Sequence, residues 1–410
     1  MARQVKAAND IRSEKKVNRP PEGELQKRLA GLQGAMANKG LAGALIFQNA
    51  DLYYYTGMIG QACFFVPVEG TPIFLSRQRG ELPTSPLWRV HKYNSWSELR
   101  HVIMEFSNPL SGKLGLEFDV IPTAMYLKIQ EVFQGQDLVD ISLLIRQQRA
   151  VKSAWEIAIL RETAKKDKLI WDKVPEMLME AKTDLELGAL FEAEARRLGH
   201  IGILRIRSFN MEMSLTCTLA DEKGAFPSLF ESPLTGVGHT AAFPFGASGV
   251  KLEGQKPILI DFGGCYEGYI TDTTRMCAIG QLPQNVLVAF DLALEIQADI
   301  VRLAKPGISC GELYEVAKDM AKEAGWDNNF MGAAGGVPFL GHGIGLEVDE
   351  LPVLARGSEV VLEEGMVIAL EPKFVVPGIG AVGIENCFVV KADRLDKLSP
   401  VADEIITINS

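Results

Sequence analysis

A β-hairpin is predicted from about residue 257 to 276, and it carries two acids between apolar strand residues. Asp261 and Asp272 are symmetric about a turn centred between Tyr266 and Glu267, beside Gly268. Directly opposite residues of an antiparallel ladder have a constant sum of positions, so this turn predicts that the two carboxylates face each other on one side of the sheet. Like charges so placed are destabilising in apolar surroundings, and the arrangement therefore requires a cation nearby.

A second hairpin, predicted from about residue 367 to 390, repeats the arrangement. Glu371 and Glu385 are symmetric about Gly378, and their strands are again apolar. A single acid in a strand is more often an exposed residue that protects the edge of a sheet. Two symmetric pairs with apolar flanks favour burial instead. The sequence therefore predicts that four carboxylates bind metal.

One histidine completes the predicted ligand set. The chain has five histidines, and His342 lies among glycines in the segment 341–345, where small residues let the backbone approach a ligand closely. Taken alone, such a histidine is more often a turn residue. Together with four carboxylates it suits a pair of Mn, Co, Zn or Fe ions, and it suits a structural zinc site poorly because that site prefers thiolates.

The order of the predicted elements divides the chain into an arm and two domains. Residues 1–20 are polar and charged, which predicts a flexible arm, and residues 21–150 alternate helical with strand patterns, which predicts an α/β domain. Ser153-Ala-Trp-Glu156 has the form of a capping box and opens the domain of residues 151–410. There, two helices followed by a hairpin occur twice, which predicts pseudo-twofold symmetry.

Composition narrows the partners that this chain can bind. Lys and Arg number 42 against 52 Asp and Glu, a formal charge of -10, and no basic block favours nucleic acid or anionic lipid. The six cysteines are scattered without a C-x-x-C pair, which predicts reduced core thiols. The start of the chain lacks the apolar core of a secretory signal, and no segment has the pattern of a membrane span. We therefore expect a cytoplasmic enzyme with a small partner.

The motifs around the five predicted ligands resemble those of the pita-bread metallopeptidases, which include methionine aminopeptidase, aminopeptidase P and prolidase, with creatinase as a non-peptidase relative. They are Ile-Asp261-Phe-Gly-Gly, Thr-Asp272-Thr-Thr-Arg275, Gly-His342-Gly-Ile-Gly-Leu-Glu, Leu-Glu371-Pro and Ile-Glu385-Asn. Segments 49–57 and 149–156 are similar to the creatinase-type domain and its linker. The resemblance implies an α/β creatinase-like N-terminal domain and an α+β pita-bread catalytic domain with pseudo-twofold symmetry.

The resemblance also implies a role for each ligand. Asp261 would chelate one ion, Asp272 and Glu385 would bridge two ions, and His342 with Glu371 would hold the other. The implied cofactor is two divalent ions, Mn or Co before Zn or Fe. Two ions that share carboxylates lower the pKa of a bridging water, so that hydroxide is present near neutral pH to attack a carbonyl. Glu371 is then the expected catalytic base.

Three positions on the substrate side depart from the family pattern. Phe245 and Asp349 stand where the peptidases of the family usually have histidines, and Gly383 stands where prolidase and aminopeptidase P tend to have an arginine. Losing the histidines removes donors aimed at the oxyanion. Asp349 is expected either to bind a substrate amine or another cation, or to be a solvated acid. His239 is expected either to enter the pocket of Phe245 or to lie on a surface loop.

These features leave three functions to distinguish. The leading expectation is a dinuclear metallohydrolase resembling Xaa-Pro aminopeptidase and prolidase, which cleaves an amide bond in a small peptide. The departures favour, as an alternative, a family member that acts on a small amidine, a modified amino acid or a zwitterion. A non-catalytic binding protein is the third interpretation, and the complete ligand set opposes it. The resemblance further implies a homodimer.

Overall fold

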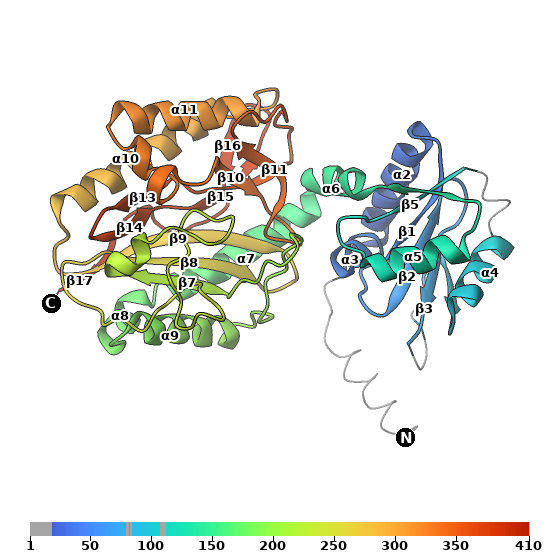
Figure 1. The fold of residues 1–410 in the computed structure, drawn as a ribbon, viewed down its shortest axis with the longest axis horizontal. Helices are drawn as coiled ribbons and strands as arrows, with labels where there is room; N and C mark the ends of the chain where they lie inside the picture. The colour runs from blue at the N-terminus through green and yellow to red at the C-terminus, as the bar shows by residue number, and fades with distance from the viewer. Residues whose placement is uncertain (1–18, 79–81, 83, 107–111, 410) are drawn as a thin grey trace, which may run out of the picture. The chain divides into compact units, whose positions relative to one another are not determined.

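The computed structural model describes residues 19–78, 82, 84–106 and 112–409, and it divides into two compact units (Figure 1). The units are Met1–Gln148 and Arg149–Ser410, so their boundary falls within helix α6 (Ser142–Ala150). Of the predicted arm, residues 1–18 lie outside the described residues.

The first unit is built on one mixed six-stranded sheet with the order β4-β3-β2-β1-β5-β6. Its central strand β1 pairs antiparallel with β2 and parallel with β5. The strands are β1 (Leu41–Ile46), β2 (Ala62–Pro67), β3 (Ile73–Ser76), β4 (Arg89–Lys92), β5 (Lys113–Leu116) and β6 (Asp137–Asp140). The helices that alternate with them are α2 (Glu22–Asn38), α3 (Asn49–Thr56), α4 (Trp96–Phe106) and α5 (Thr123–Val132). The predicted α/β class of this part is confirmed.

The second unit contains two larger sheets and a short hairpin, with helices on both sides (Figure 1). One sheet has the order β17-β9-β8-β7, and α7, α8 and α9 pack against it. The other has the order β11-β10-β12-β15-β16, and α11 packs against it while α10 covers the hairpin β13-β14. Two apolar cores result, one under each group of helices.

The helices and the two predicted hairpins of this unit occur along the chain in the predicted order. The helices are α7 (Ala154–Trp171), α8 (Val174–Glu180), α9 (Asp184–Arg197), α10 (Gln284–Leu303) and α11 (Cys310–Glu323), with short 3-10 turns η1 (Asp221–Ala225), η2 (Asp327–Asn329) and η3 (Ala333–Gly335). The strands are β7 (Thr216–Ala220), β8 (Ile258–Cys265), β9 (Ile270–Ile279), β10 (Phe339–Gly343), β11 (Glu350–Ala355), β12 (Val367–Leu370), β13 (Lys373–Val376), β14 (Gly380–Gly383), β15 (Asn386–Val390), β16 (Leu395–Lys397) and β17 (Ile406–Ile408).

The predicted capping box opens α7. The Ser153 hydroxyl accepts from the Glu156 amide, and the Glu156 carboxylate accepts from the Ser153 amide, so two amides of the helix start are satisfied. Ser309 and Glu312 form the same box at the start of α11. Helices followed by a hairpin thus occur twice, once as α7 to β9 and once as α10 to β15, which is the predicted repeat.

The register of the first hairpin differs from the prediction. Asp261 pairs with Thr274 and Asp272 pairs with Gly263, so the two acids are diagonal neighbours and not directly opposed. The turn is centred between Glu267 and Gly268, one position later than predicted, because Gly268 takes up the left-handed φ of 90° inside the turn. Moving the centre by one position shifts each partner by two, so both carboxylates keep the same face of the sheet.

The register of the second hairpin agrees with the prediction. Leu370 pairs with Asn386, and Lys373 pairs with Gly383. Both pairs have the same sum of residue numbers as Glu371 and Glu385. Along the chain, each of these glutamates lies between a residue of the first pair and a residue of the second. The two glutamates therefore occupy corresponding positions where the β12-β15 ladder gives way to the β13-β14 hairpin.

The two larger sheets are joined where the predicted ligands lie. Thr274 of β9 and Glu385 exchange two backbone hydrogen bonds of 3.3 Å, and the Asp272 amide donates to the Cys387 sulfur at 3.1 Å. The guanidinium of Arg275 is fully buried beside this junction. It donates to oxygens of both sheets and of the C-terminal segment, at Thr274, Glu385, Asn386, Val401, Ala402 and Asp403.

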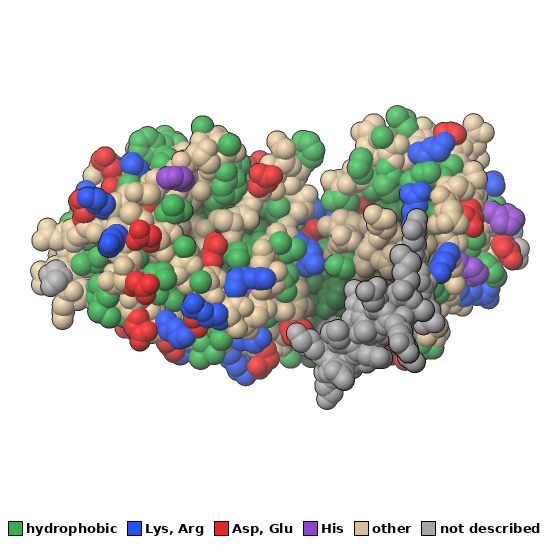
Figure 2. Space-filling model, turned by 90° about the horizontal axis from the view of Figure 1, so that it is seen from below, with side chains coloured by type: hydrophobic (Ala, Val, Ile, Leu, Met, Phe, Trp, Pro, Cys, Tyr) green, Lys and Arg blue, Asp and Glu red, His purple; other side chains and the backbone are tan. Residues whose placement is uncertain are grey.

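The cysteines lie in the interior, and the surface carries charges of both signs (Figure 2). All six cysteines are buried and free. Acidic and basic side chains are interspersed over the face drawn in Figure 2. Within the described part of the chain, no helix combines the length and apolar character that crossing a membrane requires.

A buried carboxyl group lies behind the first hairpin. Asp167 of α7 is 2 % exposed, and it accepts hydrogen bonds from the Thr271 hydroxyl at 2.5 Å and the Tyr266 hydroxyl at 3.2 Å. Gly264 makes room for it, since a Cβ there would lie 2.3 Å from either carboxylate oxygen. Burial raises the pKa of Asp167 to about 7, although the two hydrogen bonds act in the opposite direction.

This pKa predicts a pH dependence of stability. Because the folded state holds the Asp167 proton more tightly than the unfolded chain, the free energy of unfolding should fall as pH rises from about 4 to about 7, by up to about 4 kcal/mol. In Asp167→Asn this contribution should be absent. Urea unfolding across the window measures it, with the exposed Asp172→Asn at the end of α7 as control. Parallel pH profiles for Asp167→Asn and wild type would contradict the assignment.

Candidate metal centre

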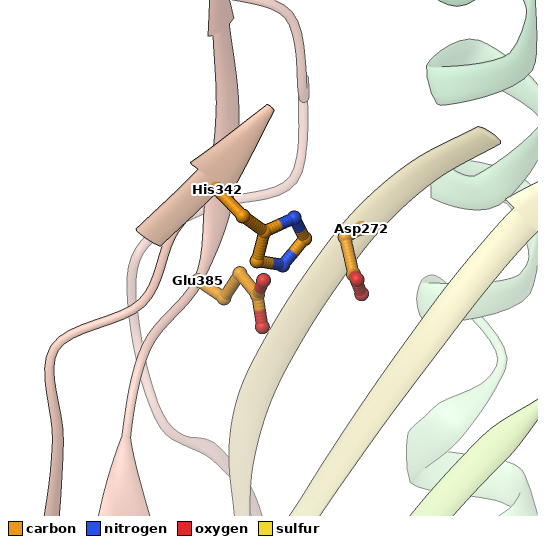
Figure 3. Close-up of side chains that lie close together, drawn as sticks. All are labelled: Asp272, His342 and Glu385. Carbon is orange, nitrogen blue, oxygen red and sulfur yellow. The ribbon is translucent and has the colours of Figure 1, made fainter. Parts of the chain in front are cut away.

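The five predicted ligands come from both halves of the second unit and meet at the junction of its sheets. Asp272, His342 and Glu385 each offer one ligand atom, and these atoms all lie within 4.8 Å of one another. Their side chains converge from separate segments of the chain (Figure 3). Glu371 Oε1 lies 3.7 Å from His342 Nε2. Asp261 is linked to Glu371 and Glu385 through the ammonium of Lys373, which contacts all three.

Two glycines fix the strand that carries His342. A Cβ at Gly341 would lie 2.2 Å from the Ala369 carbonyl oxygen, and a Cβ at Gly343 would lie 2.0 Å from that of Leu351, so β10 fits between its neighbours only with glycine there. The His342 Nδ1 lies 3.0 Å from the Gly343 carbonyl oxygen. A carbonyl can only accept, so Nδ1 carries the hydrogen of the neutral ring and Nε2 is left as the ligand atom.

A buried ion-pair cluster, which the sequence analysis did not identify, anchors the loop that follows β10. Arg149 contacts Glu347 at 2.8 Å and Glu350 at 2.5 Å, and Lys152 contacts Glu350 at 3.1 Å. Burial alone raises the pKa of Glu350, but the charges of Arg149 and Lys152 outweigh it and lower the value to about 2. The segment 149–156 was identified from its capping box and its resemblance to a linker, and neither feature predicted that its basic residues bind the loop after His342.

The most consequential residue that the sequence analysis missed is Lys373. Its side chain is 1 % exposed, and its ammonium lies 2.9 Å from Asp261 Oδ2, 2.7 Å from Glu371 Oε2 and 2.9 Å from Glu385 Oε2. Burial lowers the pKa of Lys373, but the three carboxylates outweigh it and hold the value well above the ordinary one. A signal was available, because a lysine in the apolar run after Glu371 has no partner of opposite charge within its own hairpin strand.

The donors that remain fit one metal ion. Glu385 Oε2 accepts from Lys373 and from the Thr274 hydroxyl, whereas Glu385 Oε1 is buried without a hydrogen-bond partner among the described residues. Burial and the neighbouring acids raise the pKa of Asp272 well above its ordinary value and that of Glu385 to about 7. A divalent ion would satisfy Oε1 and offset this repulsion, and two carboxylates with one imidazole suit Mn, Co, Zn or Fe.

The three residues predicted on the substrate side lie in different surroundings. Phe245 is buried, with ring centroids 6.0 Å from Phe230 and 5.7 Å from Phe243. His239 is exposed, with Nδ1 3.4 Å from the Ser248 carbonyl oxygen. Asp349 accepts hydrogen bonds of 2.7 to 2.9 Å from the Arg207 amide and from the amide and hydroxyl of Ser208. Their roles toward a substrate stay predictions.

Comparison with known proteins agrees with this architecture in both units. Residues 158–392 match the model of metallopeptidase family M24, and residues 28–151 match that of the creatinase/prolidase N-terminal domain. A Xaa-Pro dipeptidase of Pyrococcus furiosus is 26% identical over 393 residues, which cover 93% of this chain and 100% of the relative.

Solved structures show the same fold. A Xaa-Pro dipeptidase from Bacillus anthracis aligns with a TM-score of 0.77 at 22% identity, covering 94% of this chain and 100% of that one. An X-Pro aminopeptidase from Thermotoga maritima MSB8 aligns with a TM-score of 0.74 at 23% identity, covering 90% and 98%. With its ligand motifs in order and more than half of its length matched by the family model, the chain belongs to metallopeptidase family M24.

Proposed function

We propose that this protein is a metal-dependent peptidase that cleaves small peptides at a Xaa-Pro bond. The observation that carries the proposal is the convergence of Asp272, His342 and Glu385, with a buried Glu385 oxygen that lacks a partner among the described residues. The full-length likeness to a Xaa-Pro dipeptidase of Pyrococcus furiosus supports the substrate class. The relatives reported above are named for peptide substrates, which favours a peptide over a small amidine, a modified amino acid or a zwitterion.

Different residues of the site would bind the metal ion and transfer the proton. Asp272, His342 and Glu385 would hold a divalent ion, which supplies a Lewis acid for the peptide carbonyl and lowers the pKa of water. Lys373 fixes Glu371 Oε2, which leaves Oε1 facing His342. From there Oε1 can accept a proton from water and return it to the leaving amine.

The metal that we expect is Mn or Co, with Zn or Fe as ions that the same donors accept. The resemblance implied two ions. The ion that Asp261 would chelate needs carboxylate oxygens of Asp261 and Glu385 that accept hydrogen bonds from Lys373. Asp272, His342 and Glu385 are therefore assigned as the ligands of a single ion.

We also propose that the protein is a cytoplasmic homodimer without a nucleic-acid or membrane partner. The buried free cysteines and the charge of -10 support the location and the absence of such partners. The dimer rests on the resemblance alone. Light scattering on the eluting protein tests it, and a mass equal to that of one chain would contradict it.

His239, Phe245 and Asp349 stay candidates for contact with the substrate. The exposed position of His239 lets it be tested without disturbing the core. Unchanged turnover of the best substrate in His239→Ala would remove it from the site, whereas a higher KM at unchanged kcat would support a binding role.

Metal should stabilise the fold. After chelation and dialysis, added Mn²⁺ should raise the melting temperature, because a ligand that binds only the folded state at about a hundred times its Kd adds about 2.7 kcal/mol. Asp272→Asn should lose most of this shift, while Asp319→Asn on the exposed face of α11 should keep it. Differential scanning calorimetry measures the shift, and an equal shift in both variants would contradict the assigned ligands.

Activity should depend on metal and on Glu371. Mn- or Co-loaded protein should hydrolyse Xaa-Pro dipeptides or longer peptides with Xaa-Pro at the N-terminus, and chelator should abolish the activity. Glu371→Gln should lower kcat by about a hundredfold or more, because it cannot transfer the proton. Glu364→Gln, at an exposed site, is the matched control. Turnover of a small amidine or amino-acid derivative without any peptide cleavage would overturn the proposal, and binding without turnover of either class would indicate a non-catalytic protein.

A further inference from the structure

The ammonium of Lys373 fills a position among the predicted metal ligands. An ammonium has three N–H donors and no acceptor. Carboxylate oxygens of Asp261, Glu371 and Glu385 lie 2.7 to 2.9 Å from Nζ, so the described structure provides one acceptor for each donor. The group is therefore coordinated as completely as a small bound cation would be.

The structure is shaped to receive this side chain. Gly383 pairs with Lys373 across the β13-β14 hairpin. A Cβ at Gly383 would lie 2.7 Å from Lys373 Cγ and 2.9 Å from its Cα, so the glycine leaves the space that the lysine stem occupies. The residues of both strands are buried, and the lysine side chain itself is 1 % exposed.

The ammonium and a metal ion would compete for the same oxygens. Metal–oxygen bonds are about 2.0 to 2.2 Å long, which places an ion much closer to a carboxylate than the 2.7 to 2.9 Å of the ammonium contacts. Two cations on one set of oxygens also repel each other strongly where little water screens them. Asp261 and Glu371 are the predicted ligands outside the group formed by Asp272, His342 and Glu385, and Lys373 contacts both of them.

We propose that the Lys373 ammonium takes the place of one of the two ions, so that each chain binds a single divalent ion at Asp272, His342 and Glu385. This inference deepens the proposed function but rests on it only in treating the site as a metal site. The ion that Asp261 was expected to chelate is replaced by a charge built into the sequence. The same ammonium holds Glu371 and Glu385 in place whether or not the ion is bound.

Metal content tests this directly. Wild type saturated with Mn²⁺ and then passed through gel filtration should contain one Mn²⁺ per chain by inductively coupled plasma mass spectrometry. Lys373→Ala, prepared in excess Mn²⁺, should contain two, because the vacated oxygens can then hold an ion. Lys322→Ala, at an exposed site on α11, is the control and should contain one. Two ions in the wild type, or one ion in a folded Lys373→Ala, would overturn the proposal.

A second measurement covers the case in which Lys373→Ala does not fold. Anomalous diffraction from wild-type crystals soaked in Mn²⁺ should show one peak, beside His342, with the lysine still on Asp261. A peak beside Asp261 with the lysine displaced would overturn the proposal. Neither result depends on the substrate: one ion without Xaa-Pro cleavage would refute only the proposed function, and two ions with cleavage would refute only this inference.

Discussion

Four carboxylates lie close together where the two large sheets of the second unit meet, and three of them are buried. Asp272, Glu371 and Glu385 are each less than a tenth exposed, so their mutual repulsion is weakly screened. The junction holds together because cations lie against it. Lys373 contacts three of the acids, and the donors that remain fit a divalent ion. The packing around the junction therefore has to hold these cations close to the acids.

Supporting contacts position the site from several directions. Arg275 donates to oxygens on both sides of the junction and ties it to the C-terminal segment. Arg149 and Lys152 neutralise two buried glutamates in the loop after His342. Losing one partner of such a buried pair costs roughly 3 to 5 kcal/mol, because the other charge is left unpaired. These ion pairs therefore specify one arrangement of the loops, and that arrangement sets the positions of the site residues.

Much of the architecture could be predicted from local patterns. The capping boxes at Ser153 and Ser309 mark helix starts because a hydroxyl and a carboxylate three residues apart satisfy free amides without help from tertiary contacts. The symmetric placement of Glu371 and Glu385 about Gly378 gave the correct register. The predicted register of the first hairpin was wrong, because the glycine in its turn moved the centre by one position and each partner by two. The face of the acids survived because strand side chains alternate with a period of two.

The sequence by itself determined the order of the elements, the five residues that converge and the apolar strands that carry them. It did so because each depends on spacing within a short segment or on a motif. Only the tertiary structure decided which cation neutralises those acids. The sequence marks Lys373 only as a charge in an apolar run. Its role depends on Asp261, more than a hundred positions earlier in the chain, and on the space that Gly383 leaves across the hairpin. Electrostatic balance at a buried site is a sum over distant segments, and folding alone brings them within range.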